Sequence, residues 1–136
     1  MYRIFAFLIV LLIAVPSTGH AGIQVTEGDE AKTLYAADKG KVQVLVQKNK
    51  EFTLRAPGGK ETPKSETITV KVGERFYIVN EEDTFVHNVY DVTDSSWVLR
   101  KQSPGNVAAL VFNTPGKHSL RCAMHPIMKI DVNVVQ

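Results

Sequence analysis

Hydrophobic and polar residues alternate along several short runs of this chain, and a period of two is typical of β-strands with one buried face. In Val42–Gln47, valine recurs at every second position, with glutamine at positions 43 and 47. The same alternation predicts two strands within residues 66–80, separated by Gly73-Glu74. Further strand-like runs cover residues 86–92 and 107–112, a short stretch leading into Cys122, and residues 129–136.

Segments rich in Gly, Pro, Ser and Asn separate these runs and predict turns at Ala56–Ser65 and Asp94–Asn106. Only residues 27–38 favour a helix, and a short one. Many short strands, which we expect to be antiparallel, with no long helical period are typical of sandwiches and barrels. The pattern therefore predicts an all-β fold, specifically a Greek-key β-sandwich.

The first residues have the features of a secretory signal peptide. Arg3 precedes an apolar run of 12 residues, and Gly19-His20-Ala21 fits a signal-peptidase site. The run is shorter than the roughly 20 residues that a membrane-spanning helix needs. We therefore expect residues 1–21 to be removed on export to a bacterial periplasm. Residues 22–136 would then form a single domain without a membrane span.

The composition of this mature chain excludes some functions. Setting Arg3 aside leaves 15 of the 16 Lys and Arg against 14 Asp and Glu, and the basic residues are scattered. Nucleic-acid binders carry a clustered basic face, so we expect no nucleic-acid partner. A chain of about 115 residues can bury its own core, and we expect a monomer. That core forms without an intrachain disulfide, because Cys122 is the only cysteine.

A free cysteine in an oxidising compartment requires an explanation. Burial as a small hydrophobic residue would be enough by itself. However, His125 and Met128 follow Cys122 at intervals of three, on a loop between two predicted strands. Thiolate, imidazole and thioether are soft to borderline donors that suit copper and do not suit magnesium or calcium. A second imidazole would complete the two-histidine, one-cysteine set, with a weak axial methionine, of an electron-transfer copper site.

Two histidines of the mature chain are candidates for that second imidazole. His118 lies four strand residues before Cys122, about 13 Å away at roughly 3.3 Å per residue, which is too far for a shared metal. His87 lies where a polar turn, residues 80–84, runs into a predicted strand. We therefore predict His87 as the ligand and His118 as a histidine of the core or of a strand surface.

Two segments of the chain resemble the type 1 (blue) copper cupredoxins. They are ETITVKVGERFYIVNEED, followed by His87-Asn88-Val89, and TPGKHSLRCAMHPIMKIDVNV near the C-terminus. The loop C-x-x-H-x-x-M, with proline directly after the histidine, is similar to that of the amicyanins. Plastocyanins, in the same family, place the methionine farther along. The resemblance spans roughly residues 66–135.

The resemblance implies one copper ion per chain, held by His87, Cys122 and His125 in a plane and by Met128 as a long axial ligand. It also implies that Asn88 ties the two ligand loops together near the cysteine sulfur. His125 would be the ligand at the solvent edge through which electrons leave. The chain departs from the family at His118, where an aromatic residue is usual.

Two further features of the chain differ from the family. Met124 adds a second thioether beside His125, which would be able to compete as a ligand for Cu(I). The polar segment Lys50–Ser65 is longer than an amicyanin-like chain needs.

We therefore expect a periplasmic one-electron carrier that cycles between Cu(II) and Cu(I) and is not an enzyme. Its partners would be redox proteins such as a c-type cytochrome or a periplasmic dehydrogenase. The main alternative is a copper chaperone or storage protein that uses the same ligands. A structural zinc site remains a third possibility, although methionine is a poor zinc ligand. Glu81–Asp83 is either an acidic docking patch or a solvated turn.

Overall fold

The structure is a computed structural model, and it describes residues 22–136. The predicted signal peptide, residues 1–21, lies outside the described residues. The elements in chain order are β1 (Ile23–Thr26), α1 (Gly28–Asp38), β2 (Val44–Lys48), β3 (Glu51–Arg55), β4 (Glu61–Thr62), β5 (Thr67–Lys71), β6 (Arg75–Asn80), β7 (His87–Asp91), β8 (Ser96–Gln102), β9 (Val107–Phe112), β10 (Gly116–Arg121) and β11 (Lys129–Val135).

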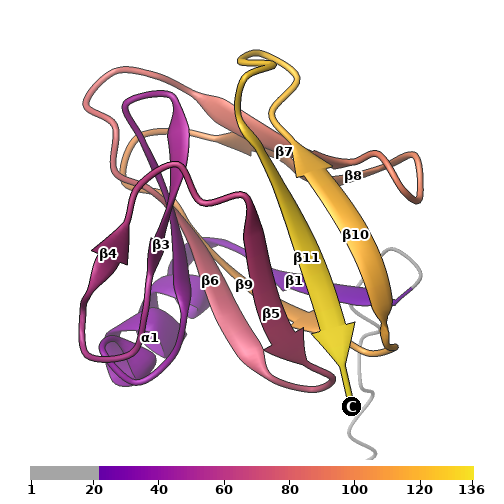
Figure 1. Cartoon of the computed structure of the whole chain (residues 1–136). Coiled ribbons are helices and arrows are strands. Elements are labelled where there is room, and N and C mark those ends of the chain that lie inside the picture. The colour runs from indigo at the N-terminus through magenta and orange to yellow at the C-terminus, as the bar shows by residue number, and fades with distance from the viewer. Residues whose placement is uncertain (1–21) are drawn as a thin grey trace, which may run out of the picture.

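The strands form two sheets that face each other, which confirms the predicted all-β sandwich (Figure 1). One sheet has six strands in the order β1-β9-β6-β2-β3-β4, and the other has five in the order β5-β11-β10-β7-β8. The described part of the chain has no helix that is long and apolar enough to cross a membrane.

The main core lies between the sheets, and the alternating pattern of the strands explains it. In β5, Ile68 and Val70 are buried while the threonines and the lysine beside them are exposed. β6 is instead buried along nearly its whole length. Its Ile78 packs in the core between the sheets, whereas Tyr77 belongs to a second cluster that includes Ala31 of α1. The helix therefore covers the outer face of the six-stranded sheet, and β6 lacks a polar face for that reason.

Some expectations from the sequence were wrong. The turn predicted at Ala56–Ser65 contains the two-residue strand β4. Residues 94–106 were predicted as a turn, but β8 lies within them. Its Val98 and Leu99 are buried, while Arg100 and Lys101 on the same strand are exposed, so the strand has only a short apolar signal. The strands are also not all antiparallel, because β2 pairs with β6 and β5 with β11 in parallel. Parallel pairs join strands that are distant in sequence, which local alternation does not reveal.

The fold brings two distant loops to the same end of the sandwich. Residues 81–86 connect β6 to β7, and residues 122–128 connect β10 to β11. Both loops lie at the top of the view in Figure 1, away from the C-terminus. β7 and β10 are neighbours in the five-stranded sheet, with Leu120 opposite Asp91. This antiparallel pairing places the beginning of β7 beside the end of β10.

Candidate metal centre

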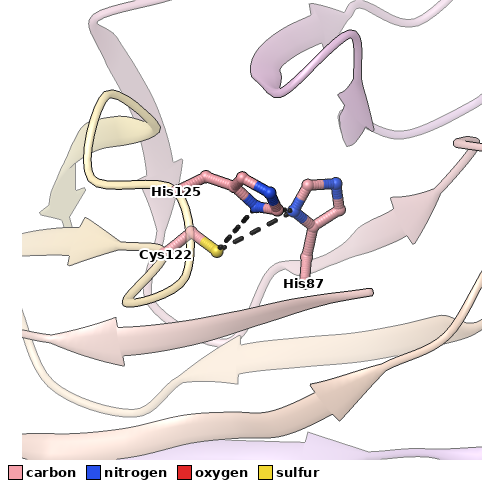
Figure 2. A group of neighbouring side chains, drawn as sticks. All are labelled: His87, Cys122 and His125. Atoms are coloured by element: carbon pink, nitrogen blue, oxygen red, sulfur yellow. Dashed lines mark hydrogen bonds between the residues drawn. The ribbon is translucent and has the colours of Figure 1, made fainter. Parts of the chain in front are cut away.

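Three donor side chains converge where the two loops meet. Nδ1 of His87 and Nδ1 of His125 each lie 3.8 Å from Sγ of Cys122, and the two nitrogens are 3.1 Å apart. Figure 2 shows the three side chains pointing toward one another, one from β7 and two from the loop after β10. The structure thus brings together three of the four residues predicted as ligands, and these three form a group able to hold a metal ion.

The spacing of these atoms suits a transition metal. A point in their plane that is equidistant from all three lies about 2.1 Å from each, close to typical metal–imidazole bonds of about 2.0–2.1 Å and metal–thiolate bonds of about 2.3 Å. One thiolate and two imidazoles are the donors of electron-transfer copper sites. The residues present therefore fit copper in both donor type and spacing.

Hydrogen bonds within the loop set the positions of its predicted ligands. The backbone N–H of Met128 donates to the carbonyl of His125 at 2.9 Å, and the N–H of Cys122 donates to the carbonyl of Met128 at 3.1 Å. These bonds close a tight turn, so Cys122 and His125 lie on one side of the loop at a separation that the backbone determines. The predicted axial residue, Met128, is tied to both other ligands of the loop.

The four residues predicted as ligands differ in their access to solvent. His87, Cys122 and Met128 are buried, with exposed fractions of 0%, 1% and 1%, whereas His125 is half-buried. Burial lowers the pKa of His87, so its imidazole is neutral and able to donate to a metal over a wider pH range. Met128 packs with Cys122 in the core between the sheets, while Met124 is 48% exposed. Met124 therefore faces solvent, and Met128 is the thioether on the interior side of the loop.

Asn88 joins the two loops, as the family resemblance implied. Its Oδ1 accepts a hydrogen bond of 2.7 Å from the backbone N–H of Ala123, the residue after Cys122. Because Asn88 follows His87 directly, this one bond fixes the spacing between ligands that are 35 positions apart in sequence. Such bonds around a metal site hold the ligands still and tune the metal.

Glu82 contacts the candidate site, which the sequence did not reveal. Its Oε1 lies 3.3 Å from Nε2 of His87 and accepts a hydrogen bond of 2.6 Å from the backbone N–H of Lys50. Burial opposes ionisation of this carboxyl, but the hydrogen bonds from Lys50 and His87 outweigh it and lower the pKa of Glu82. A carboxylate on the far nitrogen of a metal-binding histidine sets the tautomer and orients the ring. Glu82 therefore holds the far side of the His87 ring, while Nδ1 faces Sγ of Cys122.

Replacing Glu82 with glutamine should raise the reduction potential of the copper-loaded protein. Glutamine keeps an oxygen for His87 and Lys50 but removes a buried negative charge that favours Cu(II). The effect should be on the order of 1–2 kcal/mol, several tens of millivolts, as expected for a nearby charge in a partly buried site. Voltammetry measures it. Asp83→Asn is the matched control, because Asp83 is exposed and screened and its loss should shift the potential far less. Equal shifts in the two variants would contradict this role of Glu82.

An apolar patch surrounds the edge of His125. It consists of Phe85, Met124 and Ile127, which are 42%, 48% and 78% exposed. The Phe85 ring stands edge-on to the His125 ring with 5.8 Å between centroids, and Nζ of Lys50 lies 4.2 Å from the Phe85 centroid. The patch thus combines two residues of the loop after β10 with Phe85 of the loop before β7.

His118 does not join this group. Its Nδ1 lies 2.6 Å from Oδ2 of the buried Asp91, and its ring packs on Phe112 with 4.7 Å between centroids. This agrees with the prediction that His118 is a core or strand-surface histidine. His118 thus contacts an aromatic ring from a position at which the cupredoxins usually have an aromatic residue.

The chain resembles solved structures of amicyanin in fold. The reduced state of an amicyanin mutant matches with a TM-score of 0.60 and 17% identity, over 83% of this chain and 98% of that one. Amicyanin from Paracoccus versutus matches with a TM-score of 0.57 and 24% identity, over 81% of this chain and 96% of that one. A Cu(I) form of another amicyanin mutant matches with a TM-score of 0.58 and 18% identity, over 83% and 98%. No protein-family model and no curated protein matches the chain by sequence.

These likenesses extend over nearly the whole length of the amicyanins, so they concern the complete sandwich and not a shared fragment. The identities of 17–24% are too low to establish more than the fold. The predicted cupredoxin-like architecture is thereby confirmed, and the three converging donors lie in the two segments that carry the resemblance. The chain has the cupredoxin fold of amicyanin, with a His-Cys-His group at one end of its sandwich.

Proposed function

We propose that this protein is a periplasmic type 1 copper protein that carries single electrons between redox partners. The observation that carries the proposal is the triangle of His87, Cys122 and His125, formed from two loops in a protein with the amicyanin fold. Met128 would be the axial ligand. Copper, when bound, would supply the Cu(II)/Cu(I) couple.

The chain's own residues support electron transfer over metal delivery. His87 is held by Glu82, and Asn88 ties the ligand loops together, so the donors are fixed before any metal binds. A rigid site favours fast electron exchange because little has to rearrange. A chaperone must instead release its metal to a partner, which two buried ligands, His87 and Cys122, oppose.

The position of His125 provides the route for the electron. Cys122 lies in the interior, and His125 leads from it to the surface through the apolar patch of Phe85, Met124 and Ile127. Small apolar contacts suit the weak, short-lived encounters of electron-transfer proteins. We propose a redox protein, such as a c-type cytochrome or a periplasmic dehydrogenase, as the partner that docks there.

Copper titration of the mature protein tests the function. We expect one copper per chain, an intense visible band from thiolate-to-copper charge transfer, and a reversible one-electron wave in voltammetry. A reduced c-type cytochrome should bleach the band on mixing in a stopped-flow instrument. A colourless protein that binds Cu(I) and gives no reversible wave would favour the chaperone or storage alternative, and zinc retained in preference to copper would favour a structural site.

Replacing Met128 with leucine should keep copper and colour while raising the reduction potential. A thioether is a weak axial donor that favours Cu(II), so its loss stabilises Cu(I). Leucine preserves the apolar volume that Met128 fills in the core. Met124→Leu is the matched control, because Met124 is exposed and should leave the potential nearly unchanged. Voltammetry distinguishes them, and a large shift from Met124 with none from Met128 would reverse the assignment.

A further inference from the structure

We propose that Asp91, Asp94 and His118 form a second metal site, for a divalent cation of the zinc class. Nδ1 of His118 lies 2.6 Å from Oδ2 of Asp91 and 3.7 Å from Oδ2 of Asp94. The three ligand atoms all lie within 4.8 Å of one another. None of these residues belongs to the candidate copper site, so this proposal does not rest on the proposed function.

The pairing of β7 with β10 brings the three residues together. Asp91 ends β7 opposite Leu120, so the hairpin that carries Asp94 passes beside the first half of β10, where His118 lies. The backbone N–H of Thr93 donates to Oδ1 of Asp91 at 3.0 Å, and the N–H of Ser119 donates to Oγ1 of Thr93 at 3.0 Å. These hydrogen bonds within the protein hold the hairpin against β10. The three donors are therefore close together before any metal ion binds.

The two clusters are separated along the same pair of strands. His87 and Asp91 lie four residues apart on β7, and His118 precedes Cys122 by four residues along β10 and its exit. Four strand residues span about 13 Å, so one ion cannot satisfy both clusters. The sandwich would thus hold a soft, sulfur-containing site at its loop end and a harder site farther along.

Burial and charge both favour a cation at this point. Asp91 is fully buried, the His118 side chain is 10% exposed and the Asp94 side chain is 44% exposed. Two carboxylates facing one imidazole leave a net negative charge whether or not the ring is protonated, and this charge attracts a cation. A divalent cation would balance this charge, and the exposed Asp94 would admit it from solvent.

The donor set selects the class of cation. One imidazole nitrogen with two carboxylate oxygens suits zinc, which accepts both donor types at about 2.0–2.2 Å, with water completing the coordination. Magnesium and calcium prefer oxygen ligands alone. On binding, Nδ1 of His118 would release its proton to solvent, and two metal bonds would replace the hydrogen bond between His118 and Asp91.

Calorimetric titration of the copper-loaded protein with zinc chloride tests the proposal. Copper loading protects Cys122 and its neighbours from zinc, so we expect one further zinc per chain. Asp94→Asn removes a ligand but leaves the bond between Asp91 and His118, and it should weaken zinc binding at least tenfold, since even residues outside the ligand set cost roughly 10–100-fold. Asp29→Asn, an exposed change on α1, is the matched control and should bind zinc like the wild type.

A spectroscopic measurement identifies the ligand directly. Nuclear magnetic resonance of the ¹⁵N-labelled imidazoles of the Cu(I) form should show zinc shifting Nδ1 of His118, with magnesium causing no shift. A protein without saturable zinc binding, or an Asp94→Asn variant with wild-type affinity, would show that the cluster is an ion pair only. A protein that fails to bind copper would refute the proposed function instead. The same zinc titration and the His118 resonance, measured on the metal-free protein and its Asp94→Asn variant, would still test this site alone.

Discussion

Cys122→Ser should completely remove the intense visible band that we expect of the copper-loaded protein. The band requires a thiolate bound to Cu(II), and Cys122 is the only cysteine in the chain. Serine is close to cysteine in size, so the buried position should remain filled and the sandwich intact. Visible absorption and far-ultraviolet circular dichroism on the same sample separate loss of the site from loss of the fold.

The neighbouring residue supplies the control for this experiment. Ala123→Ser introduces the same hydroxyl one position along the loop, on an exposed residue, and keeps the backbone N–H that binds Asn88. It should leave the colour unchanged. A Cys122→Ser protein that stays blue would refute the assignment of the thiolate and with it the proposed function.

His87→Ala and His118→Ala should have opposite effects. His87→Ala should abolish the visible band, because within residues 22–136 two imidazoles meet Cys122 and one of them would be missing. His118→Ala should leave the band unchanged but destabilise the fold by about 2 kcal/mol, because the buried carboxyl of Asp91 loses its hydrogen bond with the imidazole. The cost should not be larger, because Asp91 keeps its hydrogen bond from the N–H of Thr93.

Urea unfolding of the zinc-free proteins and visible spectra of the copper-loaded proteins measure the two effects. The H118A variant should unfold at a lower urea concentration than the wild type, with an unchanged slope. His118→Gln is a milder comparison, because glutamine is able to donate a hydrogen bond to Asp91. The assignment of the second imidazole would be wrong if the His118→Ala variant lost the colour and the His87→Ala variant kept it.

Local patterns along the sequence predicted most of the strands and the ligand loop. Alternation over residues 66–80 predicted β5 and β6, and the run at 107–112 coincides with β9. Both patterns are visible in the sequence because each strand buries at least one face in the core. Burial of a face requires apolar side chains at fixed intervals. The spacing of Cys122, His125 and Met128 also predicted that they lie close together, because three residues on one short loop are neighbours through the covalent chain alone.

The choice of His87 over His118 also came from the sequence. It rested only on the distance along the strand, which is too long for His118 and Cys122 to share a metal. A strand has a nearly constant rise per residue, so separation along it is known without the fold. That argument shows what His118 cannot reach. It does not show that Asp91 and Asp94 meet His118, because they come from a hairpin that packs against β10 only in the folded protein.

Tertiary structure alone decided the surroundings of the site. Glu82 looks like part of an ordinary acidic turn, and only the approach of the β2–β3 hairpin gives its carboxylate the backbone N–H of Lys50 beside His87. Phe85 becomes part of the apolar patch because its loop lies next to His125. The sequence by itself determined the alternating strands and the donors of the ligand loop, since both depend on intervals along the chain. The partners of His87 and His118 depend on which strands pair and on where loops meet, and those contacts arise only when the two sheets close around their core.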